Sequence, residues 1–365
     1  MDIKMKVQEL IDNVIEKCGL NRLDRTCDQL IEGDPEMEIT GIVTTFMATV
    51  DVIKKAHELG ANLIVTHEPT YFTCNDDREW EEQDSVYLEK RKLILDYGIA
   101  IWRMHDYIHM AVEGDGIYQG LIRELGWENY HIPKMCSKER KILRESDFCY
   151  KIPKTTVGEL AKELKSKLHM DVMQIVGKPE TPVERVGILI GGGSLGLGKE
   201  YTPMQLMEEE SLDVIVCGEI VEWTLCAYVR DASMMNMNKA LIIPGHNRTE
   251  EAGMKYLPEW LQPLAPGVPI QFVEAGDGDA TAGKMQVVAQ VQEYIKNHLS
   301  EKLTLADVAA VFNFSPNYLS QLFGKYGDSG FVEYITETRI AAAKEMLERG
   351  DKKVYEIAEE LGFES

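Results

Sequence analysis

The chain has 365 residues, of which 44% are hydrophobic and 27% charged, a balance typical of a globular protein rather than a disordered or fibrous one. Two or three domains are expected at this length. The net charge of −22 argues against nucleic acid bound by the whole molecule, because affinity for phosphate comes from Lys and Arg.

Membrane and disulfide signals are both missing from the sequence. No stretch approaches the roughly 18 uninterrupted apolar residues that a membrane span needs, and residues 1–6 lead into an amphipathic segment without an apolar signal core. The seven cysteines include no Cys-x-x-Cys pair, which predicts reduced thiols. We therefore expect a cytoplasmic protein that has no membrane partner.

The first 130 residues predict an alternation of helices and strands. Helices are indicated by helical spacing of apolar residues, and buried strands by short apolar runs. In chain order these are a helix over 4–18, a β-branched run over 38–50, a helix over 52–59, a strand over 61–66, a helix over 84–97 and a strand over 98–102. Such alternation indicates an α/β sheet.

The pattern returns after a middle α/β segment over 148–177. The second half predicts strands over 186–190, 212–217 and 240–243, and helices over 203–209 and about 247–261. Residues 61–68 resemble residues 212–219, and a later strand in each half ends at a histidine, His105 and His246. This internal similarity predicts two similar α/β halves that face each other across a cleft.

Histidines and carboxylates gather at three predicted strand ends. His67 and Glu68 follow one strand, His105 and His109 another, and His246 and Glu250 a third. Ligands of α/β sheets bind beyond the carboxyl ends of strands, and residues four apart share a helix face. Imidazole with carboxylate suits Zn, Fe, Mn, Co or Ni. Each histidine alone is more simply a polar helix-cap residue, but the three clusters together favour a metal site.

The glycine-rich run over 191–196 has a weaker signal. It fits Gly-x-Gly-x-x-Gly, but Glu200 follows Gly198-Lys199 where a P-loop needs Ser or Thr, and a carboxylate there would repel phosphate. A turn in the second half is the better interpretation, with backbone amides that could line the cleft.

Three motifs resemble the Nif-three-like dinuclear metal family over roughly residues 1–275. They are Gly41 to Phe72, Pro182 to Val186 leading into Gly191-Gly192-Gly193-Ser194, and Gly245 to Glu250. Some members carry the name GTP cyclohydrolase one type two homologue. The resemblance implies two α/β halves (about 1–130 and 180–275), two divalent transition-metal ions and a homo-oligomer, often a hexamer built from trimers.

The resemblance also implies a ligand set. His67, His246 and Glu250 match family ligands directly, and His105 matches the His of an Ala-His-x-x-x-Asp segment. Two positions depart from the family pattern. Glu68 stands where a second His is usual, and His109 stands where an Asp is usual. The exchange is reciprocal, so the total ligand charge is conserved.

Two roles remain to be assigned within this ligand set. Asp106 is an alternative to His109 as a ligand; register favours His109, with Asp106 then supporting a ligand from behind. Glu250 is the best candidate to bridge both ions and the one catalytic residue we would name. A water between ions about 3.5–4 Å apart would be an effective nucleophile.

The C-terminal region changes character. Residues 276–285 predict a linker, and residues 286–365 predict consecutive helices, with Thr304 and Ser315 as N-caps and Pro316 in a first helical turn. Ser315-Pro316-Asn317-Tyr318-Leu319-Ser320 and the runs 339–347 and 354–363 resemble the AraC-type helix-turn-helix domain. Relative to that family the segment is incomplete, because the second recognition helix is missing.

The resemblance places Asn317, Tyr318, Gln321 and Lys325 on the first recognition helix, as DNA-binding candidates. Lys325 is its only cation, and residues 285–365 hold 8 Lys and Arg against 13 Asp and Glu, a net charge of −5. We therefore expect weak DNA binding by the chain alone, unless oligomer avidity compensates.

Three functions fit these observations. The first is a metal-dependent hydrolase of a small phosphorylated or nucleotide-like substrate. The second is a transcription regulator that binds DNA through the AraC-type module and uses the metal domain as a sensor. The third is a non-catalytic metal scaffold. The sequence leaves open whether any reaction is catalysed.

Overall fold

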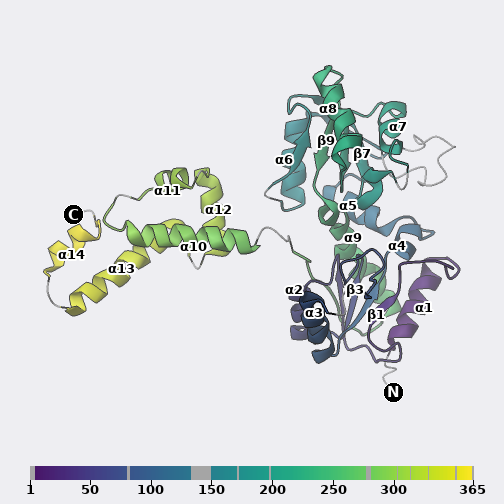
Figure 1. Ribbon diagram of the computed structural model, residues 1–365, viewed down its shortest axis with the longest axis horizontal. Coiled ribbons are helices and arrows are strands. Elements are labelled where there is room, and N and C mark those ends of the chain that lie inside the picture. The colour runs from purple at the N-terminus through teal and green to yellow at the C-terminus, as the bar shows by residue number, and fades with distance from the viewer. Residues whose placement is uncertain are drawn as a thin grey trace. The chain divides into compact units, whose positions relative to one another are not determined.

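The structure, a computed structural model, describes residues 5–79, 83–132, 149–170, 172–196, 199–276, 281–301, 303–312, 314–327, 329–349 and 352–363. The chain forms two compact units, Met1–Ala275 and Gly276–Ser365. The first unit contains two five-stranded sheets and the second contains helices (Figure 1). The predicted fold class, α/β with an all-helical C-terminal segment, is confirmed.

The first sheet has the strand order β1-β4-β3-β2-β10. Its strands are β1 (Leu30–Glu32), β2 (Ile42–Thr45), β3 (Leu63–Thr66), β4 (Ala100–Arg103) and β10 (Ile270–Phe272). β2, β3, β4 and β10 are parallel, and β1 pairs antiparallel with β4 at the edge. β10 follows the second half in sequence but completes the first sheet, so the chain returns to it.

Both faces of this sheet are buried, which explains the uninterrupted apolar runs of its strands. Val43, Ile64 and Ile101 pack on one face with residues of α2 (Val50–Glu58) and α3 (Ser85–Asp96). Alternate residues such as Leu63 and Trp102 join the main core with α1 (Val7–Lys17). Figure 1 shows α2 and α3 on one side of the sheet and α1 on the other.

The second sheet has the order β5-β7-β8-β9-β6. Its strands are β5 (Cys149–Thr156), β6 (Gln174–Val176), β7 (Pro182–Leu189), β8 (Val214–Cys217) and β9 (Ala240–Ile243). The three central strands are parallel, and the two edge strands are antiparallel to them. Its helices are α6 (Val157–Lys167), α7 (Thr202–Glu209) and α8 (Ala227–Met234).

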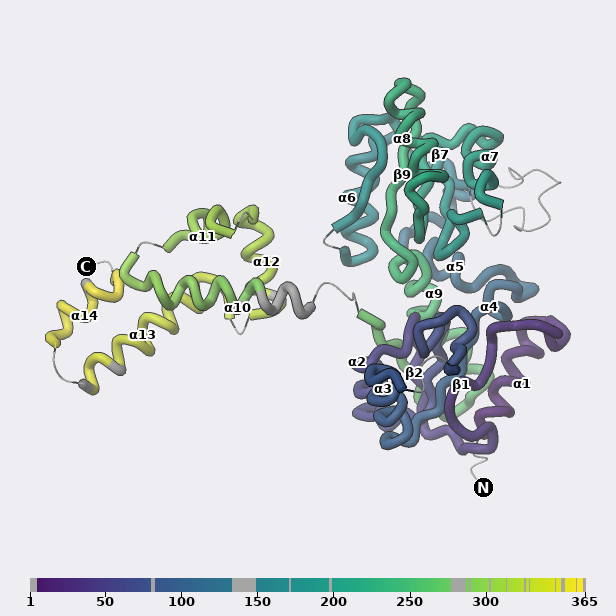
Figure 2. Tube along the Cα trace, viewed as in Figure 1, coloured from purple at the N-terminus to yellow at the C-terminus, as the bar shows by residue number. Residues whose placement is uncertain are grey.

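Helices α5 (Gly116–Leu125) and α9 (His246–Leu261) lie between the two sheets (Figures 1 and 2). They cross at Gly120 and Gly253, where a Cβ on Gly120 would lie 2.4 Å from the Cα of Gly253. Only glycine allows so close an approach of two backbones. The crossing positions α9, which carries His246 and Glu250, against α5 and so close to α4 (Asp106–Met110), the short helix that precedes α5.

The second unit consists of α10 (Thr281–Asn297), α11 (Leu305–Val311), α12 (Pro316–Tyr326), α13 (Phe331–Arg349) and α14 (Val354–Glu360). It has its own core, in which Phe323 and Leu319 are fully buried. Thr304 and Ser315 cap α11 and α12 through their side chains, as predicted.

Two negative findings apply to the described part of the chain. The six cysteines within it are free thiols. None of its helices is both long and apolar enough to cross a membrane. Cys136 lies outside the described residues.

Candidate metal centre

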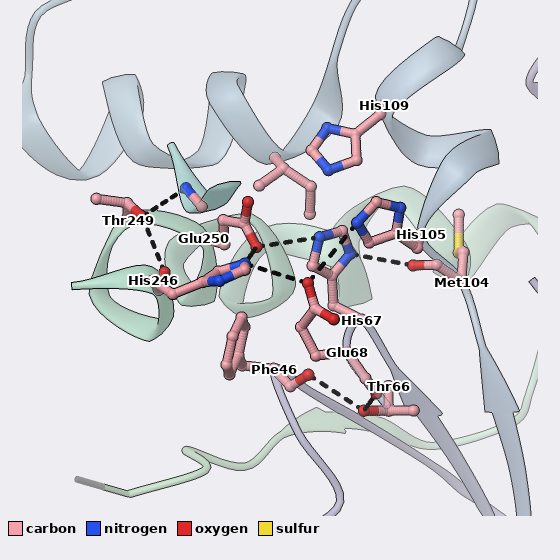
Figure 3. A network of polar contacts seen from close by, with 12 residues as sticks. Phe46, Thr66, His67, Glu68, Met104, His105, His109, His246, Thr249 and Glu250 are labelled. Atoms are coloured by element: carbon pink, nitrogen blue, oxygen red, sulfur yellow. Dashed lines mark hydrogen bonds and ion pairs between the residues drawn. The ribbon is translucent and has the colours of Figure 1, made fainter. Parts of the chain in front are cut away.

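The structure brings together all six residues that the sequence proposed as ligands. His67 and Glu68 follow β3, His105 follows β4, His109 lies in α4, and His246 and Glu250 begin α9 (Figure 3). The Oε2 atom of Glu250 lies 3.3 Å from the Nε2 atom of His67 and 2.9 Å from that of His246. The Oε1 atom of Glu68 lies 3.1 Å from His246 Nε2. Strand ends from both halves therefore converge on one cluster.

Every histidine of the cluster is held by its Nδ1 atom. The partners are Met104 O at 3.2 Å from His67, Asp106 Oδ1 at 3.0 Å from His105, Asp115 Oδ2 at 2.8 Å from His109 and Glu219 Oε1 at 2.8 Å from His246. An acceptor at Nδ1 fixes a proton there, so Nε2 is the nitrogen that each ring can offer to a metal ion. All four imidazoles therefore offer Nε2 as the ligand atom.

These partners also settle where Asp106 lies. Its carboxylate is behind the ring of His105 and also accepts hydrogen bonds from the Thr26 hydroxyl at 2.8 Å and the Cys27 amide at 3.1 Å. Both of its oxygens are therefore engaged, whereas His109 has its ring 5.0 Å from that of His67. Asp115 is itself fixed, because it caps α5 by accepting the amides of Ile117 and Tyr118.

Glu68 is oriented by Arg103, which is buried. The Nη2 atom of Arg103 donates to Glu68 Oε2 at 3.1 Å, and the same guanidinium donates to the carbonyl oxygens of His67 and Cys74. One oxygen of Glu68 is thus committed to arginine and the other faces His246. The pairing compensates the buried carboxylate.

Helix α4 is capped by a residue from a distant loop. Its own N-cap, His105, makes no capping hydrogen bond. Instead the carboxylate of Asp28 accepts the amides of His105 at 2.9 Å, Asp106 at 2.6 Å and Tyr107 at 3.1 Å. Asp28 therefore positions the helix that carries His109.

The glycine-rich run forms a short helical turn, Gly191–Leu195, against the cluster. A Cβ on Gly191 would lie 2.0 Å from Glu250 Oε1 and 2.7 Å from His246 Nε2. The Gly191 amide donates to the Thr249 hydroxyl at 3.0 Å. The run is thus a turn at the site, as the sequence indicated, and its backbone forms one wall.

The cluster fits a metal ion. Two of its inward atoms, His67 Nε2 and Glu250 Oε2, are fully buried and have no hydrogen-bond partner of good geometry in the described part of the chain. Burying polar atoms without well-formed hydrogen bonds is costly, so this pair marks a place that suits a cation. The ligand atoms of His67, His105 and His109 lie within 4.8 Å of one another, as do those of His67, Glu68 and Glu250. Imidazoles and carboxylates are ligands of divalent transition metals.

The electrostatics of the cluster follow from burial and from charge. Burial lowers the pKa of His67. Burial also opposes the charged form of His246, but its hydrogen bonds to Glu250, Glu68 and Glu219 outweigh this and raise its pKa to about 11. The pKa of Glu250 is well below its usual range despite burial, because His246 and His67 face it. The carboxylates that raise the pKa of His246 would also stabilise a cation at this place.

Sequence reasoning missed the residues that position the ligands: Asp28, Arg103, Asp115 and Glu219. Only Glu219 had a usable signal, because residues 212–219 resemble residues 61–68 and place it at the position of Glu68. The two glutamates contact opposite nitrogens of the His246 ring.

The candidate DNA-contact residues lie in the second unit. Asn317 and Gln321 are exposed on α12, one helical turn apart. Tyr318 is partly buried, with its ring 5.2 Å from that of Phe314. The side chain of Lys325 lies outside the described residues.

Comparisons with known proteins agree with both resemblances. A family model described as Duf34/NIF3 (NGG1p interacting factor 3) matches residues 5–277, and a helix-turn-helix domain model matches residues 308–365. The GTP cyclohydrolase 1 type 2 homolog of Clostridium acetobutylicum is 24% identical over 253 residues, 68% of this chain and 86% of that protein.

The other two relatives cover one unit each. The HTH-type transcriptional regulator YijO of Escherichia coli is 43% identical over 84 residues, which are 23% of this chain and only 30% of the regulator. The crystal structure of Staphylococcus aureus protein SA1388 aligns with a TM-score of 0.55 at 19% identity, covering 76% of this chain and 98% of that one. The last match shows a shared fold.

Proposed function

The chain belongs to the Duf34/NIF3 family, and from this membership and the site geometry we propose that residues 1–275 form a dinuclear metal-binding hydrolase domain. Its substrate would be a small phosphorylated or nucleotide-like molecule, a class suggested by the name of the Clostridium acetobutylicum relative. The ligands would be His67, Glu68, His105, His109, His246 and Glu250.

The observation that carries this proposal is the pair of buried atoms His67 Nε2 and Glu250 Oε2, which contact each other but make no hydrogen bond of good geometry in the described part of the chain. They face each other at 3.3 Å from separate halves of the domain. Paired divalent ions polarise a substrate oxygen and lower the pKa of a shared water. The chain's own part is to fix the donor atoms: Glu250 faces imidazoles from both halves, and the oxygen atoms hydrogen-bonded to Nδ1 hold each ring in its orientation.

Metal analysis and a hydrolase panel together test this proposal. Wild type should hold two metals per chain and hydrolyse a phosphorylated or nucleotide-like substrate, and His246→Ala should lose both properties. His57→Ala is the matched control, because His57 stacks on Tyr97 with ring centroids 4.0 Å apart, outside the cluster. Two bound metals without activity on any substrate would refute the hydrolase but not the metal centre.

A second function is favoured by the helix-turn-helix match over residues 308–365. We propose that the chain binds DNA weakly through α12 and that metal occupancy of the first unit modulates this binding. Self-association, as the hexamer implied by the family resemblance, would supply several copies of α12 to one DNA.

DNA binding is tested by titrating the protein onto its own upstream DNA at several salt concentrations, with and without chelator. Asn317→Ala and Gln321→Ala should each cost about 1–3 kcal/mol of sequence discrimination, whereas Thr336→Ala, exposed on α13, should not. A response that is equal for all sequences would refute the regulator.

A further inference from the structure

We propose that the centre is built for two different metals, with an imidazole pocket that prefers zinc and a carboxylate pocket that prefers a harder ion such as manganese. This inference rests on the proposed dinuclear function. It comes from the arrangement of the six donor residues in two groups of three, one of which contains Glu250.

The imidazole pocket is formed by His67, His105 and His109. The ring of His67 lies 4.6 Å from that of His105 and 5.0 Å from that of His109, and the latter two are 4.8 Å apart. Each ring has its Nδ1 atom engaged, so the pocket can present three Nε2 atoms as nitrogen donors. Three imidazoles with an open fourth position are a donor set that zinc adopts readily.

The carboxylate pocket is formed by Glu68, His246 and Glu250. The Nε2 atom of His246 lies 3.1 Å from Glu68 Oε1 and 2.9 Å from Glu250 Oε2. This pocket therefore offers anionic oxygen from two residues and a single nitrogen. Oxygen donors suit manganese and magnesium better than they suit softer ions.

The two pockets differ in the residues that lie near only one of them. His67 Nε2 is within reach of both, at 3.3 Å from Glu250 Oε2. Glu68 Oε1, however, lies closer to His246 Nε2, at 3.1 Å, than to His105 Nε2, at 3.7 Å. The ring of His109 lies near those of His67 and His105 (Figure 3).

Buried contacts keep the two donor sets apart. Arg103 holds Glu68 Oε2 at 3.1 Å and is itself anchored to two backbone carbonyls, so Glu68 has one free oxygen and little freedom to turn. Asp115 holds His109 from behind at 2.8 Å. The side chains of Arg103 and Glu68 are only 5% and 13% exposed, so little solvent competes with their contact. The asymmetry is thus fixed by the fold.

Metal competition in the full-length chain tests the inference. Because zinc binds more tightly than manganese to most donor sets, the informative condition is limiting zinc. Metal-free protein is loaded with Mn²⁺, one equivalent of Zn²⁺ per chain is added, and free ions are removed. We expect one zinc and one manganese per chain, and a manganese EPR spectrum that changes from a spin-coupled pair to isolated ions.

Two variants assign the pockets. His109→Ala should lose zinc and keep manganese, whereas Glu68→Gln, nearly unchanged in shape, should lose manganese and keep zinc. Each loss should exceed the roughly 10-fold to 100-fold weakening typical of removing an outer partner of a ligand. His57→Ala should match wild type, and circular dichroism checks that each variant is folded.

The outcomes separate this inference from the proposed function. If one equivalent of zinc gives a mixture of dizinc and dimanganese chains, or if both variants lose the same metal, the pockets are equivalent and the inference is wrong, although the dinuclear centre stands. If wild type binds neither metal, the proposed function itself fails. The wild-type EPR result does not depend on how well the variants fold.

Discussion

Asp28 offers the sharpest test of how the candidate centre is positioned. It is not a proposed ligand, yet its carboxylate accepts three consecutive amides at the start of α4, from His105, Asp106 and Tyr107. Asp28→Ala removes these hydrogen bonds and leaves the amides without their acceptor. We predict that it weakens metal binding although every ligand remains.

The size of the effect follows from the capping contacts. Loss of an N-cap side chain costs about 0.5–2 kcal/mol, and three amides on one carboxylate place Asp28 in the upper part of that range. If α4 frays in the metal-free protein, metal binding must reorder it, so the cost appears in the affinity. A cost of about 1–2 kcal/mol corresponds to roughly 5-fold to 30-fold weaker binding.

Asp84→Ala provides a matched control. Asp84 caps α3 in the same way, by accepting the amides of Val86 at 2.9 Å and Tyr87 at 3.0 Å, but α3 carries none of the proposed ligands. Both variants should lower the melting temperature by about 2–4 °C per kcal/mol lost. Calorimetric titration with Zn²⁺ should weaken only in Asp28→Ala. Equal metal affinity in the two variants would refute the positioning role.

Three further predictions concern the site and the core beside it. Gly191→Ala should abolish metal binding, because its Cβ would lie 2.0 Å from Glu250 Oε1, whereas Gly192→Ala, whose Cβ would have nothing within 4 Å, should bind metal as wild type does. Equal loss in both variants would contradict the conclusion that the Gly191 backbone forms a wall of the site. Metal loading should release protons, because the raised pKa of His246 keeps it protonated until the pH approaches about 11. Metal affinity should therefore rise by roughly tenfold per pH unit for each proton released. Calorimetric heats that do not vary with the ionisation enthalpy of the buffer would contradict this. Tyr118→Phe should destabilise the first unit by about 1–3 kcal/mol in a denaturant titration, because the Tyr118 hydroxyl donates to Ile188 O and accepts from Ile190 N; an unchanged midpoint would contradict it.

Most of the fold was predictable because its strands are short and apolar, and because apolar residues recur at helical spacing in the helices between them. The predicted strands over 61–66 and 212–217 correspond to β3 and β8, and the predicted helix over 84–97 corresponds to α3. One missed element, β10, has a pattern that is decided by tertiary contacts. β10 has three residues that are exposed or only half-buried, so it has no apolar run, and it becomes a strand only by pairing with β2. Helix α5 was also missed, although Asp115 and Gly126 mark its two ends.

The proposed ligands were predictable one by one, because each lies immediately after a recognisable strand. Their division into pockets was not, because it depends on which atom of each side chain is already engaged. Nothing near Glu68 in sequence indicates that Arg103 takes one of its oxygens, and nothing near His105 indicates that Asp28 caps the next helix. Such contacts join residues that only the packed sheet brings together.

The similarity between residues 61–68 and 212–219 shows how differently the two halves contribute to the cluster. Equivalent positions carry Glu68 and Glu219, and both glutamates contact His246. The equivalent of His67, however, is Gly218, where a Cβ would lie 2.4 Å from the Gly191 carbonyl oxygen. The space that an imidazole would need in the second half is therefore filled by the turn that forms a wall of the cluster. The first half keeps its donors, and the second half contributes His246 and Glu250 with the backbone that encloses them.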